Sequence, residues 1–328
     1  MLDSILLSFN NAVKLGTLLP TNNIGKEENP LPTTLSQELT INGHSIPVKN
    51  LDKTFWPEEG YTKGQIMEYY IKVWPTLAPH LKDRPLSLVR YPEGIDGQYF
   101  YQKNFPKAPP WVETLPLQSE ARVINYVIAN NLETLIWAVN LGCIEVHPWL
   151  STRHDLDHPT YLIFDLDPMP PATFREAVQV ALAIKSLTDH LNLTVFPKIS
   201  GATGLHLYLP VKPVYTYQET GKFVEQLGNA VIRVLPALAT NERKISDRGG
   251  KVYIDHLQNR KGKTIAAVYS LRPLPGAPVS MPVTWEELPA VRPDRFTITS
   301  APAHLAAIGD RFAPLCWLQQ ELPSELLL

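Results

Sequence analysis

The sequence has little of three features that would assign it to a large class of proteins at once: cysteine, surplus charge and long apolar runs. Its 328 residues contain two cysteines, Cys143 and Cys316, and both stand between apolar neighbours. We therefore expect two small core residues in a reducing compartment, and neither a disulfide nor a metal pair. The formal net charge is −2, so any binding to nucleic acid must come from local basic patches.

Signals for export or for a membrane are also missing. No run reaches the ~18 apolar residues of a membrane span, and Asp3 stands where a secretory signal peptide needs positive charge. We expect a cytoplasmic protein without a membrane partner. The hydrophobic fraction of 44% is ample for a core, and the length allows two domains or one large one at ~100–200 residues per domain.

A pair of carboxylates follows an apolar run at residues 161–168, YLIFDLDP. Four apolar residues that lead to a turn signal indicate a buried strand. Because side chains alternate along a strand, Asp165 and Asp167 project from the same face. Such carboxylates repel each other unless a cation lies between them, and oxygen ligands favour Mg²⁺ or Mn²⁺. For this motif alone, a solvated turn at a strand end is an equally good interpretation.

The elements around this pair predict a split βαβ arrangement. The pattern gives a strand at 160–166, a helix at 172–191, a hairpin of 194–199 and 205–211, a helix at 218–237 and a strand at 251–257. In this topology the first strand lies between the third and the fourth, both antiparallel to it. His206 and Asp255 should then reach the same sheet face as Asp165 and Asp167.

The fold class that we predict is α+β, with a split βαβ (RRM-like) palm sheet, flanking helices and an additional N-terminal mixed α/β part. We divide the chain into an extension and linker (1–40), the N-terminal part of one module (41–150), and its palm with the C-terminal part (151–328). Ahead of the palm we expect a helix at 4–15, a strand pair near 39–48, a helix from the capping box at 62–65 to about residue 75, strands at 86–90 and 98–102, a helix at 131–141 and a strand at 144–147.

Three carboxylates on one sheet face could hold two divalent ions. Polymerases and nucleases use two such ions to activate an attacking oxygen and to stabilise a leaving one. The turn SGATG at 200–204 offers backbone N–H groups and a hydroxyl to a phosphate, although such turns are mostly structural. The stretch 243–263 is locally basic, and phosphate binding explains it at least as well as a solvated face does.

Basic and aromatic residues also stand together in the N-terminal part. Lys53 and Lys63 flank Phe55 and Trp56, and Phe100 stands between two tyrosines. Such groups can hold a nucleic-acid backbone and stack on bases, although aromatic pairs more often belong to a core.

Together these motifs resemble the polymerase domain of bacterial DNA ligase D, a member of the archaeo-eukaryotic primase superfamily. The similarity runs from about residue 51 to residue 312. It is carried by LDK at 51–53, TKG at 62–64, FYQK at 100–103, IEVHPW at 144–149, DLDP at 165–168, KISGATGLH at 198–206, IDHLQN at 254–259 and YSLR at 269–272. No single motif is specific, but the set is.

The resemblance implies a primase-polymerase-like enzyme that adds NTPs or dNTPs to a primer 3′ end, in gap filling or non-homologous end joining. It implies two Mn²⁺ or Mg²⁺ ions held by Asp165, Asp167 and Asp255. Around the incoming nucleotide it places His147, Ser200, His206, Arg248, Gln258 and Arg272.

The resemblance also implies a DNA surface. It places Lys53 and Lys63 at the 5′-phosphate of a downstream strand, Phe100 and Tyr101 under the template base, and Lys103 among the DNA contacts. The partners that it implies are DNA with a 5′-phosphate end or a gap, a separate DNA ligase and a Ku-like end-binding protein.

The chain departs from the family at a few positions. Thr203 stands where relatives often have lysine, Gln258 where some have arginine, and Leu274 where some have a second arginine, so we expect a lower affinity for nucleotides. No Lys-x-Asp-Gly ligase motif occurs in the sequence. We therefore expect a stand-alone polymerase-like protein, or one whose ligase is a separate chain.

Two other functions remain as alternatives. A phosphatase of the haloacid-dehalogenase type also places a DxD motif after an apolar strand, but it wants Thr or Val where Met169 stands here. A non-catalytic nucleic-acid-binding module could share the split βαβ fold. Its aromatic RNP signatures are absent from the sequence, and uncompensated carboxylates would repel a nucleic-acid backbone.

Overall fold

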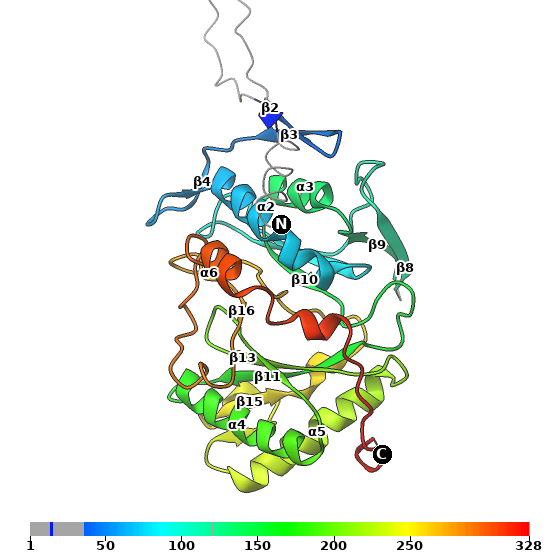
Figure 1. The fold of residues 1–328 in the computed structure, drawn as a ribbon, viewed down its shortest axis with the longest axis vertical. Helices are drawn as coiled ribbons and strands as arrows, with labels where there is room; N and C mark the ends of the chain where they lie inside the picture. The colour runs from blue at the N-terminus through cyan, green and yellow to red at the C-terminus, as the bar shows by residue number, and fades with distance from the viewer. Residues whose placement is uncertain (1–13, 16–35, 120, 328) are drawn as a thin grey trace, which may run out of the picture.

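The computed structural model describes residues 14–15, 36–119 and 121–327. One six-stranded sheet, which we call the palm sheet, has the strand order β14-β15-β11-β13-β12-β16 (Figure 1). Its strands are β11 (Tyr161–Pro168), β12 (Phe196–Ile199), β13 (Leu205–Pro210), β14 (Ala239–Thr240), β15 (Val252–Asp255) and β16 (Met281–Pro282). β11 lies between β13 and β15 and is antiparallel to both. This confirms the split βαβ order and the central position predicted for the first strand.

The part of the chain that precedes the palm contains a five-stranded sheet with the path β10-β6-β9-β8, to which β7 adds by pairing with β6. Its strands are β6 (Pro85–Arg90), β7 (Phe100–Gln102), β8 (Thr114–Gln118), β9 (Val123–Ile128) and β10 (Cys143–Pro148). The helices α2 (Lys63–Leu81) and α3 (Leu132–Asn140) pack against each other. Smaller elements are β1 (Lys14–Leu15), β2 (Ser36–Ile41), β3 (His44–Lys49), β4 (Thr54–Trp56), β5 (Tyr61–Thr62) and α6 (Ala301–Ile308).

Two amphipathic helices, α4 (Phe174–His190) and α5 (Tyr217–Val234), cover one face of the palm sheet. In Figure 1 both lie below the sheet, on the side away from α2 and α3. α5 packs against β15 at Gly228, where a Cβ would be in van der Waals contact with the Ile254 side chain, 3.4 Å from its Cγ2. Ile254 and its pairing partner Leu166 thus face α5. Their neighbours in sequence, the carboxylates, face the opposite side.

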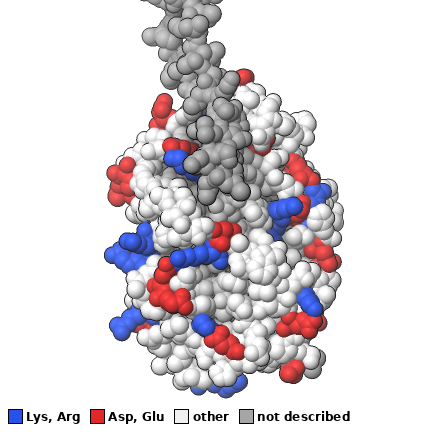
Figure 2. Space-filling view, viewed as in Figure 1, with Lys and Arg blue, Asp and Glu red and all other residues white. Residues whose placement is uncertain are grey.

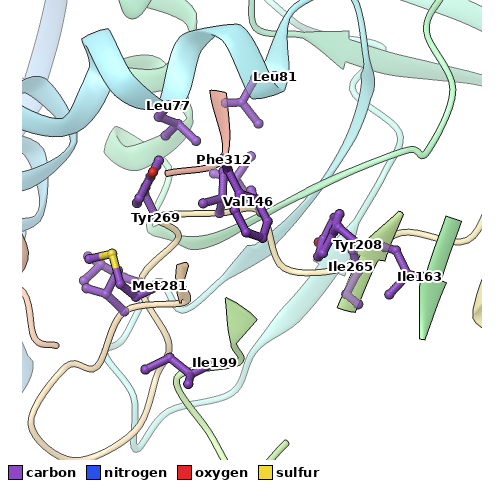
Figure 3. Packing of buried hydrophobic residues seen from close by; sticks show 14 of the residues in the cluster. Leu77, Leu81, Val146, Ile163, Ile199, Tyr208, Ile265, Tyr269, Met281 and Phe312 are labelled. Carbon is purple, nitrogen blue, oxygen red and sulfur yellow. The ribbon is translucent and has the colours of Figure 1, made fainter. Parts of the chain in front are cut away.

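That opposite side is covered by the N-terminal part, and a single buried cluster contains residues of both. Figure 3 shows Leu77 and Leu81 of α2 on one side of Phe312, with Tyr208 and Ile163 of the palm sheet on the other. Apolar packing between the two parts fixes their relative position, since interiors are packed nearly as densely as organic crystals. Polar groups from both parts can therefore be held against each other with precision.

The helix predicted to begin at the capping box of Thr62 is confirmed, but its predicted end at Pro75 is wrong. α2 continues to Leu81 and contains Pro75 and Pro79. A proline inside a helix removes a hydrogen bond and crowds the preceding turn, so the continuation needs compensation. Leu77 and Leu81 supply it, since both side chains are fully buried in the shared core.

Three apolar residues lie outside the core, although Cys316 among them was predicted to belong to it. Leu182 of α4 and Val234 of α5 are both exposed. Leu182 lies one position, and hence about 100° around the helix, beyond the buried Ala181, and Val234 lies at the last position of α5. Cys316 is exposed as well, whereas Cys143 is buried, and both thiols are free.

The other predicted helices and strands are confirmed within a few residues. The strands β8 and β9 had not been predicted. The strand predicted to reach residue 257 ends at Asp255, because this residue caps the 3₁₀ helix η2 (His256–Asn259). The helix predicted at 4–15 lies outside the described residues except for 14–15, which form β1. No helix in the described part of the chain is both long and apolar enough to cross a membrane.

Candidate active site

The predicted carboxylates meet on the face of the palm sheet that looks away from α4 and α5. Asp165 of β11 pairs with His206 of β13 on one side and with Asp255 of β15 on the other. Asp167 lies on the same face of β11. Opposed residues on antiparallel strands have Cβ atoms ~4.5–5.5 Å apart, so residues from three strands come together here. We call these four residues the floor of the site.

The charges of the floor oppose one another. Burial raises the pKa of Asp165 well above its usual value, and the charges of Asp167 and Asp255 raise it further. Burial and Asp255 also raise the pKa of Asp167. Burial and nearby cations lower the pKa of His206 well below its usual value, so its imidazole is neutral at pH 7. The floor therefore holds negative charge that the imidazole does not compensate.

The donor set of the floor fits a divalent cation. Asp165 Oδ1 is buried without a hydrogen-bond partner, although His206 Nε2 lies 3.4 Å away. Asp255 uses Oδ1 to accept hydrogen bonds from the Leu257 N–H at 2.9 Å and from the Tyr253 hydroxyl at 3.1 Å. Within the described ranges, no three His, Cys, Asp or Glu side chains are arranged as a group that could hold a metal ion. Metal binding by Asp165, Asp167 and Asp255 therefore stays a prediction.

A cavity of about 310 Å³ adjoins the floor. Seven of the predicted site residues line it: His147, Asp165, Asp167, Ser200, His206, Gln258 and Arg272. Asp255 and Arg248 are not among its lining residues. Residues 264–266 also line it, and no sequence motif had pointed to them. Gln258 Nε2 donates to the Thr264 carbonyl at 2.8 Å, so the amide that replaces an arginine of some relatives is used within the protein.

A group of complementary charges lies at one side of the cavity. We call it the wall and define it as His147 and Arg272, which line the cavity, together with Glu145 behind them. Glu145 accepts hydrogen bonds from His147 Nε2 at 2.8 Å and from Arg272 Nε at 2.6 Å. Burial alone would raise the pKa of Glu145, but the bond from His147 and the charge of Arg272 outweigh it and hold this pKa at about 2. No role had been predicted for Glu145. Its i, i+2 spacing from His147 on a predicted strand was the available signal that the two share a face.

The turn at 200–204 shapes the edge of the cavity. Ser200 Oγ accepts hydrogen bonds from the N–H groups of Ala202 and Gly204, both at 3.1 Å. Gly201 has φ of +72°, and a Cβ there would come within 2.8 Å of the Val279 carbonyl carbon. A Cβ at Gly204 would lie 2.8 Å from the Leu166 carbonyl oxygen. Only glycine lets the turn lie this close to the palm sheet.

Two further basic side chains flank the floor. The Arg248 guanidinium lies 3.7 Å from the centre of the Tyr253 ring, and its charge partly offsets the raised pKa of Asp167. Lys198, to which the sequence analysis gave no role, pairs with His206 across β12 and β13 and is fully buried. Its Nζ donates to the Ala266 carbonyl at 3.0 Å.

The two predicted 5′-phosphate lysines lie in the N-terminal part. Lys63 is buried, and its Nζ donates to the Lys49 carbonyl at 2.8 Å and to Asn140 Oδ1 at 2.7 Å. Burial, and then the charge of Lys53, lowers the pKa of Lys63 to about 8. Lys53 itself contacts the exposed Glu93. The Lys63 N–H donates to the Lys53 carbonyl at 2.9 Å, so the two lysines are neighbours in space.

The predicted stacking residues are exposed. Phe100 and Tyr101 of β7 are 47% and 52% exposed, and Lys103 is exposed beside them. Tyr101 reaches toward the cavity, where its hydroxyl contacts Thr264 Oγ1 and its ring lies edge-on to His147 at 5.8 Å. Large aromatic side chains that are exposed in one place indicate a binding surface.

Charges of both signs lie side by side over the face shown in Figure 2, and neither sign forms a continuous field on that face. This distribution agrees with the net charge of −2. On the face shown, a polyanion therefore meets no continuous basic surface.

With this geometry established, comparisons with known proteins can be interpreted. The family profile described as "LigD, primase-polymerase domain" matches residues 62–312. A solved structure, "Polymerase Domain from Mycobacterium tuberculosis Ligase D in complex with DNA", superimposes with a TM-score of 0.77 at 30% identity. The match covers 83% of this chain and 98% of that one.

Relatives of known function are longer than this chain. The "Bifunctional non-homologous end joining protein LigD" of Bacillus subtilis is 33% identical over 294 residues, which are 87% of this chain and 47% of that protein. The "Multifunctional non-homologous end joining protein LigD" of Mycolicibacterium smegmatis is 31% identical over 275 residues, 82% of this chain and 36% of that protein. The chain thus spans half or less of the length of these relatives.

Proposed function

Because the chain belongs to the family of LigD primase-polymerase domains, we propose that it adds nucleotides to the 3′ end of a primer at gaps or broken ends of DNA. This family membership confirms the resemblance seen in the sequence, the mixed α/β fold and the nucleotidyltransferase class. It also argues against a phosphatase and against a non-catalytic binding module.

The observation that carries the proposal is that the carboxylates of the floor and the basic side chains of the wall lie around one cavity. In nucleotidyl transfer a 3′-hydroxyl attacks the α-phosphate of a nucleoside triphosphate and pyrophosphate leaves. The electrostatic needs of this step are the same: cations near the phosphates and ligands for metal ions. Family members are metal-dependent. For this chain we propose two Mn²⁺ or Mg²⁺ ions held by Asp165, Asp167 and Asp255. When bound, such ions activate the attacking oxygen and stabilise the leaving one.

The chain's own residues supply the binding and orientation of the nucleotide. Arg272 and His147 face the cavity and are positioned to neutralise a triphosphate, while the Ser200 turn borders the same space. Arg248, which lies beside the floor, is available to a phosphate that enters from that side. Gln258, tied to Thr264, acts by holding the loop 264–266 in place.

The DNA contacts are also proposals. Lys53 and Lys63 would bind a 5′-phosphate, since Lys63 has used two of its three N–H donors and keeps one for a ligand. Phe100 and Tyr101 would stack on a template base, with Lys103 on the backbone nearby. A separate DNA ligase and a Ku-like end-binding protein are the partners that such a reaction would need.

Primer extension tests the proposal directly. A labelled primer on gapped and on open templates is incubated with NTPs or dNTPs and with Mn²⁺ or Mg²⁺, and the products are sized. We expect added nucleotides that depend on the template and on the metal ion, and none with Asp167→Ala. Asp189→Ala on the exposed side of α4 is the matched control and should extend normally. Release of phosphate from a generic ester, without incorporation, would overturn the proposal.

A further inference from the structure

A carboxylate outside the cavity fixes two of the groups that line it. Glu145 lies on β10, in the sheet of the N-terminal part, and is 6% exposed. It is not among the residues that line the cavity, whereas its hydrogen-bond partners His147 and Arg272 are. Any effect of Glu145 on a ligand must therefore pass through these two side chains.

The backbone around Glu145 is built to present it at this place. The pairing of β10 with β6 has a register shift between Cys143 and Glu145, and such irregularities re-aim side chains next to active sites. The Val146 N–H donates to Ser270 Oγ at 3.1 Å, and the Ala267 N–H donates to the Val146 carbonyl at 2.9 Å. β10 is thereby attached to the loop that carries Arg272.

Glu145 and one backbone carbonyl together determine which edge of Arg272 meets a ligand. Nε donates to Glu145 Oε1 at 2.6 Å, and Nη1 donates to the Ser200 carbonyl at 2.7 Å. A guanidinium has five N–H donors in a rigid plane. Because Nε and Nη1 are bound to groups of the protein, the Nη2 hydrogens, which no acceptor takes in the described part of the chain, remain for a ligand in the cavity that Arg272 lines.

Glu145 also determines the tautomer of His147. A carboxylate with a pKa of about 2 is ionised at neutral pH and only accepts hydrogen bonds. The ring nitrogen that faces it, Nε2 at 2.8 Å, must therefore carry a proton. The other nitrogen, Nδ1, remains for a ligand: it accepts a hydrogen bond when the ring is neutral and donates one to a phosphate when the ring is an imidazolium.

We propose that Glu145 is a positioning residue, which presets Arg272 and His147 for the triphosphate of the incoming nucleotide. The identity of this ligand rests on the function proposed above, whereas the presetting of the two cationic groups rests on the contacts of Glu145. An arginine held in one orientation loses less side-chain entropy when a phosphate binds. Glu145 thus determines nucleotide affinity without touching the nucleotide.

Glu145→Gln tests the proposal because it keeps the shape of the side chain and removes its charge. Glu145 accepts from Arg272 through Oε1 and from His147 through Oε2, and an amide keeps an acceptor oxygen at only one of these two places. Either the bond from Arg272 or the bond from a protonated Nε2 of His147 is therefore lost. We expect the KM for the nucleotide to rise about tenfold, the effect typical of one lost charge-assisted hydrogen bond, with kcat reduced far less. The KM for primer-template should stay the same, which a general loss of structure would not produce.

Two further variants sharpen the result. Glu133→Gln on α3 alters a glutamate that is equally buried and does not line the cavity, so its nucleotide KM should match that of the wild type. In the background of Arg272→Ala and His147→Ala, Glu145→Gln should add little, because the groups through which it acts are gone. An additive loss in that background would overturn the proposal, and so would an unchanged nucleotide KM in Glu145→Gln itself.

Direct binding separates this inference from the proposed polymerase activity. Calorimetry with a nucleoside triphosphate and Mg²⁺, without DNA, measures affinity whether or not the protein extends primers. If Glu145→Gln binds the nucleotide more weakly but the wild type extends no primer, the polymerase proposal is wrong and the positioning role of Glu145 is supported. If the wild type extends primers normally but both proteins bind the nucleotide equally well, the polymerase proposal is supported and the positioning role is wrong. If Glu145→Gln does not fold, Glu145→Asp decides: its shorter side chain should weaken binding, and unchanged binding would contradict the proposal.

Discussion

Asp165 on the floor is partly buried and Glu145 on the wall is buried, and the two carboxylates differ in whether their oxygens have partners. On the floor, Asp165 has an oxygen without a partner and a pKa raised by burial and by like charges. On the wall, Glu145 has both oxygens bound to cationic groups and a pKa of about 2. The same chemical group is thus unsatisfied in one place and fully satisfied a short distance away.

This difference shows what each region is built for. A carboxylate that is left unsatisfied costs stability and persists where an added cation relieves it. A carboxylate whose partners are fixed holds geometry, because a buried pair is strongly destabilised if one member is lost. The floor is therefore the place for an added ion, and the wall is the preformed frame against which a nucleotide binds.

The largest expected effect breaks the floor. Asp165→Asn keeps the shape of the side chain but removes the charge on which a metal ion depends, so primer extension should fall by at least ~100-fold. DNA binding, measured by fluorescence anisotropy, should change little. Extension at wild-type rate would show that the carboxylate has no part in the reaction.

The second prediction concerns the wall: the contribution of Glu145 to the free energy of unfolding should depend on pH. The pKa of Glu145 is lowered from 4.5 to about 2 in the folded protein, so its ionised form stabilises the fold above pH 4.5, and this contribution disappears as the pH falls toward 2. At ~1.36 kcal/mol per pKa unit, the contribution is about 3 kcal/mol. The difference in the free energy of unfolding between the wild type and Glu145→Gln should therefore shrink over this range. Denaturant titrations at pH 6, 4 and 3 measure it, and a constant difference would contradict the assignment.

The third prediction concerns the floor, where removing the charge of a carboxylate should stabilise the fold and not destabilise it. Without divalent ions, Asp165→Asn should melt at a higher temperature than the wild type at pH 7, since a raised folded pKa means that ionisation opposes folding. The advantage should diminish as the pH falls and Asp165 takes up its proton. Mn²⁺ at ~100 times its Kd should stabilise the wild type by about 2.7 kcal/mol and Asp165→Asn by less. Equal stabilisation of both proteins would place the ion elsewhere.

The smallest effect lies outside the cavity, at the lysine pair. Lys53→Ala should weaken binding to gapped DNA about tenfold, and only when the downstream strand carries a 5′-phosphate. Because the pKa of Lys63 is lowered to about 8, the preference for a 5′-phosphate should decline between pH 7 and pH 9. Lys63→Arg, which stays charged, should remove this pH dependence. Equal loss on 5′-hydroxyl DNA would make Lys53 a general backbone contact.

Much of the floor could be predicted from the sequence because it depends on local pattern and on topology. The i, i+2 spacing of Asp165 and Asp167 fixes their common face, and the order of strands and helices fixes which strands lie beside β11. These two facts predict that His206 and Asp255 share a sheet face with Asp165, which is confirmed, whereas the register that pairs Asp165 with both residues comes from the structure. The rotamer of Asp255 does not follow from them, because the local cap of η2 determines it.

Other features could not be predicted because they depend on contacts between distant parts of the chain. The end of α2 was misjudged because the core around Leu77 and Leu81 overrides the local effect of Pro75. The exposure of Cys316 is another example, since apolar neighbours in sequence do not ensure burial in space.

The sequence by itself determined the palm and its acidic face, since strand periodicity and chain order are properties of nearby residues. Only the tertiary structure determined the wall, where Glu145 of β10 accepts a hydrogen bond from Arg272, which is 127 residues away in sequence. The physical reason is that the partners of a buried charge are chosen by packing between distant segments, and no spacing along the chain records that choice.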